Sequence, residues 1–111
     1  MHELTITESI LEIALRHSQS RRITDLHLAI GQLSSIIDDS VQFYWDIISQ
    51  GTLAEGARLH FRRIPTEMVC QECNRRYAPS GGDLACPDCS SPRVKVVAGD
   101  EFMLESIEVE N

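Results

Sequence analysis

The hydrophobic positions of the chain repeat with helical spacing in two places. The first repeat follows a capping box, Thr5-x-x-Glu8, in which each side chain satisfies a backbone N–H at a helix start. Its apolar members are Ile6, Ile10, Ile13 and Ala14. The second repeat follows Asp38 and Asp39, whose carboxylates suit the positive end of a helix. Its apolar members are Val41, Tyr44, Trp45 and Ile48. The pattern predicts one helix over residues 5–18 and another from Asp38 or Asp39 to a cap at Gly51.

Three other segments alternate between apolar and polar residues, as half-buried strands do. They cover residues 25–30, which end at Gly31, residues 59–62 and residues 102–109. The last one changes phase, so we expect either a bulge near Glu105-Ser106 or a strand covered on both faces. The order of elements favours an α+β fold in which two helices pack on one face of a three-stranded sheet.

A segment of different composition interrupts this fold. Between Pro65 and Gly99 lie all four cysteines, three of the four prolines, the Gly81-Gly82 pair and few large apolar residues. We expect such a segment to be unable to bury a core, so that a bound metal supplies its folding energy. The sequence therefore predicts an α+β domain over residues 1–65 plus 99–111, and an inserted metal-binding module over residues 66–98.

The cysteines form two identical pairs, Cys70-Gln-Glu-Cys73 and Cys86-Pro-Asp-Cys89. Each Cys-x-x-Cys turn directs two thiolates to one point, and residues 74–85 are long enough to return the chain and complete a tetrahedron. This spacing predicts a closed structural zinc site in a zinc-ribbon-like module. Iron bound as in rubredoxin is the nearest alternative. Disulfides or a redox pair are disfavoured, because the chain begins without a signal-like segment and neither pair reads as a helix start.

Composition limits the classes of function. The 111 residues carry a formal charge of −7, which argues against nucleic-acid binding, and no apolar run is long enough to cross a bilayer. We expect a cytoplasmic protein. No phosphate loop, nucleophile elbow or His-Glu-x-x-His motif occurs, so we do not expect an enzyme. The remaining histidines fit ordinary surface positions: His17 at a helix end, and His27 and His60 on exposed strand faces.

The start of the chain, Met1-His2-Glu3, suggests a second metal site. The bulky His2 favours retention of Met1, and the predicted helix start leaves residues 1–4 outside the helix. The Met1 amine, the His2 amide nitrogen and the His2 imidazole can form two fused chelate rings around one cation. Three nitrogens in a plane favour Ni(II) or Cu(II), and Glu3 can add a fourth donor through its amide or carboxylate.

Taken together, these segments resemble the HypA/HybF family of nickel metallochaperones. The resemblance rests on Met1-His2-Glu3-Leu4, Ile30-Gly31-Gln-Leu33-Ser34, Gly51-Thr52-Leu-Ala54-Glu55-Gly56, the two cysteine pairs and Ser106-Ile107-Glu108-Val109, in that order along the chain. It implies transient Ni(II) at His2, with the Met1 amine and Glu3 in support, and structural Zn(II) at Cys70, Cys73, Cys86 and Cys89. Some members place an acidic residue near the second helix start, where this chain has Ile37 with Asp38 beside it.

The resemblance also implies a role in maturing NiFe hydrogenase. The expected partners are a nickel-handling GTPase and the hydrogenase large subunit, and the protein itself would be a monomer or a homodimer. A zinc-ribbon interaction adaptor without a second metal is the alternative function.

Overall fold

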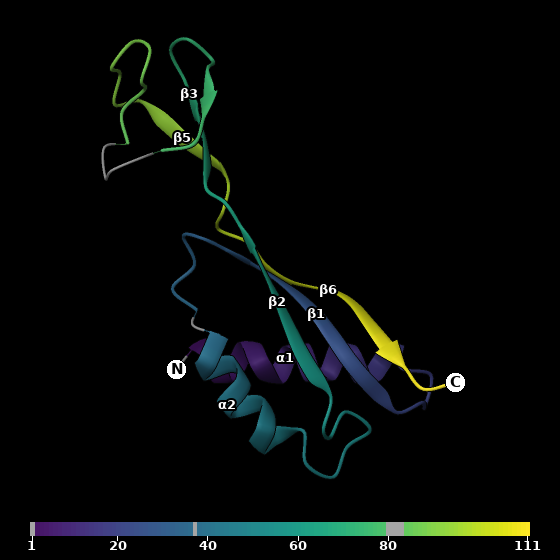
Figure 1. Cartoon of the computed structure of the whole chain (residues 1–111). Helices are drawn as coiled ribbons and strands as arrows, with labels where there is room; N and C mark the ends of the chain where they lie inside the picture. Colours follow the sequence, from purple (N-terminus) through teal and green to yellow (C-terminus); the bar gives the residue numbers. More distant parts are fainter. Residues whose placement is uncertain (1, 37, 80–83) are drawn as a thin grey trace. The chain divides into compact units, whose positions relative to one another are not determined.

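The computed structural model describes residues 2–36, 38–79 and 84–111, with the side chain of His2 outside this set. Over these residues the chain forms two helices and six strands (Figure 1). They are α1 (His2–His17), β1 (Ile23–Gly31), α2 (Asp38–Ile48), β2 (Arg58–Ile64), β3 (Glu67–Cys70), β4 (Arg76–Tyr77), β5 (Val94–Ala98) and β6 (Phe102–Val109). None of the helices in the described residues has the length and hydropathy needed to cross a membrane.

Contacts divide the chain into two compact units. The first comprises Met1–Ala29, Ser35–Arg62 and Met103–Asn111, and the second comprises Ile30–Ser34 and Arg63–Phe102. The short segment Ile30–Ser34 therefore belongs with the cysteine-containing unit, although it lies far from the cysteines in sequence.

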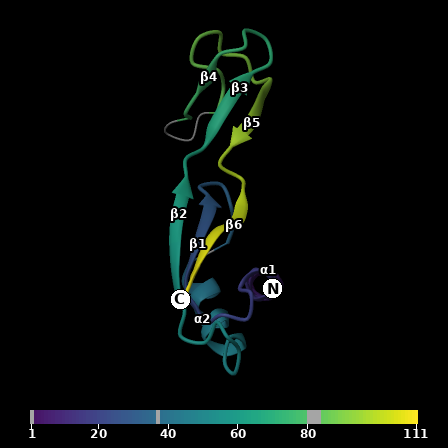
Figure 2. The same cartoon turned by 90° about the vertical axis from the view of Figure 1, so that its right-hand side faces the viewer.

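The larger sheet has three strands in the order β2-β1-β6, which confirms the predicted α+β architecture. Helices α1 and α2 pack against each other and cover one face of this sheet (Figures 1 and 2). The central strand is the most buried element, because it has a neighbour on each side and helices on one face. Its fully buried side chains include Ile23, Leu26, Leu28 and Ile30. Each such side chain contributes about 1.5–3 kcal/mol relative to an exposed one.

Helix α1 begins at His2, so the predicted start at Thr5 is wrong. Thr5 and Thr7 lie inside the helix, and the Thr7 hydroxyl donates a hydrogen bond to the Glu3 carbonyl one turn earlier. A hydroxyl bonded in this way to a carbonyl at i−4 fits within a helix and does not cap it. Residues 2–4 are therefore the first helical turn and not an extended leader.

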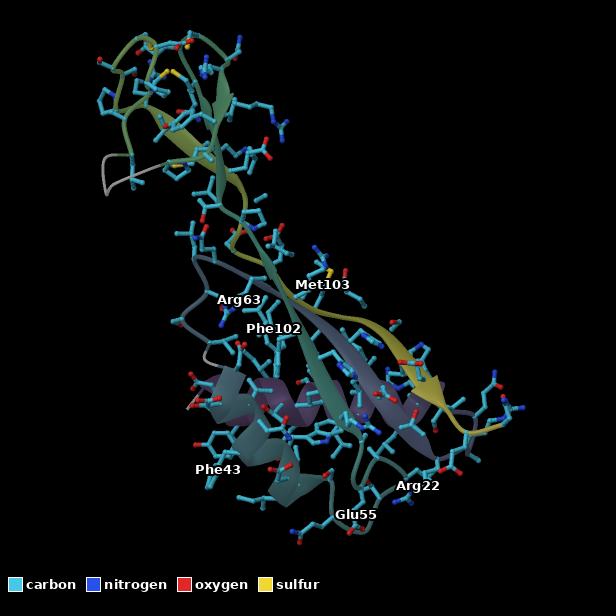
Figure 3. All side chains as sticks on the ribbon, in the orientation of Figure 1. Arg22, Phe43, Glu55, Arg63, Phe102 and Met103 are labelled. Atoms are coloured by element: carbon cyan, nitrogen blue, oxygen red, sulfur yellow. The ribbon has the colours of Figure 1, made fainter. Side chains whose placement is uncertain are left out.

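The two helical stripes are only partly buried. Ile10 and Ala14 of α1, and Val41 and Trp45 of α2, are buried as predicted, whereas Ile13 remains 39% exposed. On the outer face of α2, Phe43 is 61% exposed, and Figure 3 shows its side chain extending away from the sheet. The second helix begins at Asp38 as predicted.

Strand β6 shows the predicted change of phase. Its half-buried apolar residues are Phe102, Leu104, Ile107 and Val109. Glu105 and Ser106 are consecutive and both exposed. The alternation therefore shifts by one residue at this point.

The cysteine-containing unit has a second sheet, with strand order β4-β3-β5, that the sequence analysis missed. Both neighbours run antiparallel to β3, with Met68 opposite Tyr77 on one side and Val96 on the other. Met68 and Tyr77 are buried together with Cys70 and Cys86, and Val94 and Val96 pack against them. The expectation that this segment buries no core is therefore wrong, because it buries a small one built partly from two of the cysteines.

Candidate metal sites

The two cysteine pairs fold into matching turns. In each turn, the N–H that follows the second cysteine donates to the carbonyl of the first cysteine: Asn74 to Cys70 and Ser90 to Cys86, both at 2.9 Å. Asn74 and Ser90 also share a left-handed backbone, with φ angles of 63° and 61°. This repeated geometry places the pairs in turns and not at helix starts, as predicted.

The four sulfur atoms lie within 4.8 Å of one another, and the cysteines are free thiols. The Sγ atoms of Cys70 and Cys89 are 3.6 Å apart, as are those of Cys73 and Cys86, and the Cys89–Cys73 distance is 3.8 Å. A zinc–sulfur bond of about 2.3 Å gives a tetrahedron whose edges measure about 3.8 Å. The cluster therefore fits a four-coordinate zinc ion, and these spacings are far longer than a disulfide bond of about 2.05 Å.

Backbone donors and neighbouring thiols set the charge of this cluster. The N–H of Cys73 donates to the sulfur of Cys70 and lowers the pKa of that thiol to about 7. The N–H of Ser91 favours the thiolate of Cys89, but the adjacent thiol of Cys70, burial and the other thiols outweigh it and raise that pKa to about 12. The Cys89 thiol is therefore protonated near neutral pH without a cation, and metal binding by this sulfur releases its proton.

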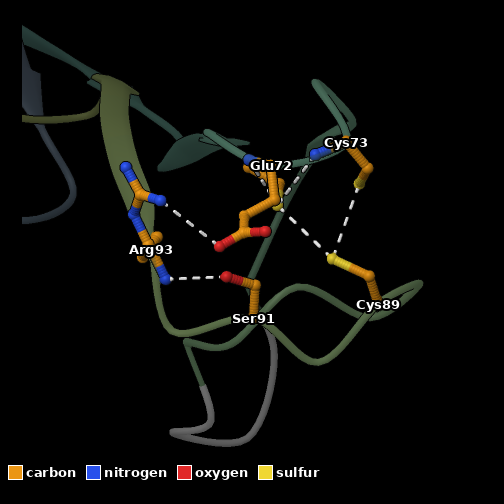
Figure 4. Close-up of polar contacts among 6 residues, drawn as sticks. Glu72, Cys73, Cys89, Ser91 and Arg93 are labelled. Atoms are coloured by element: carbon orange, nitrogen blue, oxygen red, sulfur yellow. Dashed lines mark hydrogen bonds and ion pairs between the residues drawn. The ribbon is translucent and has the colours of Figure 1, made fainter.

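Two ion pairs join the turns reciprocally. The guanidinium of Arg93, which follows the second pair, lies 3.5 Å from the carboxylate of Glu72 inside the first pair (Figure 4). Arg75, which follows the first pair, lies 3.1 Å from Asp88 inside the second. The sequence analysis did not identify this arrangement, although the acidic residue occupies the same place in each Cys-x-x-Cys. Exposed pairs of this kind contribute little energy individually, so they connect the two turns without being the main source of their stability.

The N-terminal candidate is described only in part. His2 and Glu3 occupy the first turn of α1, Glu3 is half-buried, and Met1 and the His2 side chain lie outside the described residues. Ile37 also lies outside them. The first four N–H groups of any α-helix lack an intrahelical acceptor, so the His2 amide nitrogen is not used by the helix.

The other histidines are His17 at the end of α1 and the neighbouring His27 and His60 in the larger sheet. His17 ends α1, as predicted, with its Nδ1 atom 2.9 Å from the Ile13 carbonyl. His27 and His60 are partly exposed strand residues, as predicted, and their rings also stack against each other. Their neighbouring strands place them side by side in the sheet.

Comparison with known proteins gives consistent matches along the chain. The family model described as "Hydrogenase/urease nickel incorporation, metallochaperone, hypA" matches residues 1–109. The hydrogenase maturation factor HypA of Dehalococcoides mccartyi strain 195 is 40% identical over 114 residues, covering 100% of this chain and 96% of that protein. The protein of the same name from Geobacter sulfurreducens is 38% identical over 110 residues, covering 99% and 100%.

Two solved structures share the fold. The solution structure of the Ni metallochaperone HypA from Helicobacter pylori has a TM-score of 0.70 at 21% identity, covering 96% of each chain. A second solution structure, of a HypA protein, has a TM-score of 0.78 at 23% identity, covering 99% of this chain and 97% of the other.

Proposed function

Because this chain belongs to the HypA family of nickel-incorporation metallochaperones, we propose that it binds Ni(II) at its N-terminus and helps insert the ion into NiFe hydrogenase during maturation. The family consists of maturation factors and not of enzymes. The expected partners are a nickel-handling GTPase, which would supply or share the ion, and the hydrogenase large subunit, which would receive it. The reduced cytoplasm suits a protein with four free thiols.

The observation that carries this proposal is the start of α1 at His2. A helix that begins there leaves the His2 amide nitrogen outside the intrahelical hydrogen bonds, so losing its proton to a metal disrupts no helical bond. The proposed ligands are the Met1 amine, this amide nitrogen and the His2 imidazole. Three nitrogens in one plane suit Ni(II) and disfavour metals without a planar preference, such as zinc.

The positive charge at the start of α1 limits the affinity of the proposed N-terminal site for Ni(II). The N-terminal end of a helix carries about half a positive charge, which repels a bound dication. The deprotonated amide removes one unit of charge from the complex, and the Glu3 carboxylate can remove another. A site that depends on this compensation suits a chaperone, because it binds the ion without trapping it.

The cysteine cluster takes the structural role in this proposal. Cys70, Cys73, Cys86 and Cys89 would hold Zn(II) with no open position for a substrate, so the ion supplies folding energy and no chemistry. The small apolar cluster around Met68 and Tyr77 supports the turns, and the metal joins them.

Nickel titration monitored by absorption tests the function. Protein with its native N-terminus should bind one Ni(II) and develop the yellow absorption of a planar d⁸ ion, and His2→Ala should abolish this band without changing zinc content. His17→Ala serves as the matched control and should leave the band unchanged. If no band develops, the chain is better described as a zinc-ribbon adaptor, and a red iron absorption in the purified protein would assign the cysteines to iron.

A further inference from the structure

The outer face of α2 carries a stripe of apolar and acidic side chains that the fold leaves uncovered. Phe43 and Ile47 lie one helical turn apart and are 61% and 53% exposed. Asp39 and Asp46, both exposed, share this face, because they precede Phe43 by four residues and follow it by three. Figure 3 shows the Phe43 side chain extending away from the sheet. We call these four residues the outer stripe of α2.

Folding does not explain the apolar residues of this stripe. Helix α2 already buries Val41 and Trp45 on its inner face. Single exposed apolar residues are ordinary on protein surfaces, but Phe43 and Ile47 at helical spacing form one continuous apolar strip. The Phe43 ring also makes an edge-on contact with the Tyr44 ring, with centroids 5.4 Å apart. An aromatic side chain that is already held in place loses less conformational entropy when a partner covers it.

The carboxylates of the stripe lack a compensating cation. Asp46 accepts a hydrogen bond of 2.8 Å from the neutral amide of Gln42, and no basic side chain pairs with Asp39 or Asp46 in the part of the chain that the structure describes. On the exposed face of the sheet, by contrast, Glu105 is paired with Arg62. An apolar surface flanked by uncompensated negative charge favours a partner that is apolar and flanked by positive charge.

We propose that the outer stripe of α2 is the docking site for an amphipathic helix of a partner protein, whose narrow apolar face is flanked by lysine or arginine. Side chains at i and i+4 form the ridge that packs into a groove of a second helix. Apolar side chains of the partner would cover Phe43 and Ile47, and its cations would lie beside Asp39 and Asp46. Anionic lipid, nucleic acid or a second copy of the stripe would instead place negative charge against negative charge.

The size of the stripe predicts a transient contact. Helix α2 has 11 residues and is about 16 Å long, so one of its faces buries less than the roughly 800 Å² per partner of a stable interface. Phe43 is the expected anchor, since an aromatic residue near the centre of an interface commonly carries much of the binding energy. The charge pairs would mainly speed association and fix orientation, and their effect would fall as salt is raised.

Titration with a synthetic helical peptide tests the proposal without nickel and therefore independently of the proposed function. The probe is a peptide of leucine and lysine whose leucines form one stripe along the helix. One control peptide has glutamate in place of lysine, and another has the same composition in scrambled order. The full chain is titrated with each peptide, and its backbone amide signals are followed by NMR. We expect only the leucine–lysine helix to bind, with its largest shifts in residues 39–47 and an affinity that falls as salt is raised.

Variants distinguish docking at the stripe from general attraction to an acidic protein. Phe43→Ala should weaken binding of the leucine–lysine helix by about tenfold. Replacing both Asp39 and Asp46 by asparagine should weaken it several-fold and reduce its dependence on salt. Met103→Ala is the matched apolar control, because it shortens a 44% exposed side chain on β6 (Figure 3). Asp100→Asn is the matched charge control outside α2, and neither control should change the affinity.

The proposal is overturned if the leucine–lysine helix does not bind, if its shifts centre outside α2, or if the glutamate peptide binds as well. Equal affinity of the folded Phe43→Ala protein would also overturn it. Sedimentation equilibrium of the wild-type and Phe43→Ala proteins tests a second copy as the occupant. A wild-type dimer that Phe43→Ala dissociates would assign the stripe to self-association and would contradict the proposal.

Discussion

Gly31 offers the sharpest test of how the cysteine-containing unit is held together. A Cβ atom added at this residue would lie 2.1 Å from the Gly99 carbonyl oxygen and 2.6 Å from the Asp100 nitrogen, where ordinary contacts begin near 3.4 Å. The backbone would have to separate by about 1 Å, which strains two hydrogen bonds of 2.7 Å, from Gly31 N–H to Glu101 and from Leu33 N–H to Gly99. Two weakened hydrogen bonds and the overpacking together predict that Gly31→Ala costs about 3–5 kcal/mol.

The assay is chemical denaturation combined with amide hydrogen exchange at Leu33. We expect Gly31→Ala to lower the free energy of unfolding and to speed exchange of the Leu33 amide. Gly51→Ala is the matched control: no atom lies within 4 Å of its added Cβ, and only its positive φ of 77° is strained, at about 1–2 kcal/mol. Equal losses in the two variants, with Leu33 still protected, would refute the close approach as the reason for glycine at residue 31.

Three further predictions concern charge and metal. Cys73→Ala should remove zinc and disorder both cysteine turns while the helices and larger sheet persist, and full hydrogen-exchange protection of the turns after chelation would contradict this. Glu3→Gln should weaken nickel binding several-fold at low salt, because it removes a negative charge beside a bound dication, and an unchanged titration would exclude this carboxylate from the site. The pKa of Asp25 is lowered mainly by the hydrogen bond from His60, so its contribution to stability is present above pH about 4 and is lost as pH falls through the folded pKa. In His60→Ala this acid-side loss should shrink, and an NMR titration of Asp25 that is identical in both proteins would contradict the hydrogen bond.

The period of the apolar residues predicted the helices and the larger sheet. An element that buries one face has apolar residues that recur with its own helical or strand period. The start of α1 was placed wrongly because the pattern Thr5-x-x-Glu8 can also occur inside a helix, where hydroxyls such as those of Thr7 and Ser9 bond to carbonyls one turn earlier. Gly31 was interpreted as the end of its strand, and β1 does end there, but the sequence did not reveal that this glycine permits a close approach by Gly99. Such a contact depends on a distant segment, which local pattern does not reveal.

For the candidate sites too, the sequence predicted the local structure and missed the contacts between distant segments. The spacing of the cysteines predicted their cluster, since a Cys-x-x-Cys turn is a local structure. The small sheet that supports them was missed, because Met68, Tyr77 and Val96 are too far apart in sequence to form a periodic pattern. The stacking of His27 on His60 depends on the register between two strands, which the alternation alone does not fix.

Nickel binding at the free N-terminus is the central claim, and adding one glycine before Met1 tests it most directly. The extension converts the Met1 amine into an amide and displaces the chelate while every side chain is retained. Nickel affinity, the absorption spectrum and zinc content would be measured for both proteins. We expect the extended protein to keep its zinc and to lose both the planar nickel band and its affinity for nickel. An extended protein that bound nickel as tightly, with the same spectrum, would contradict it.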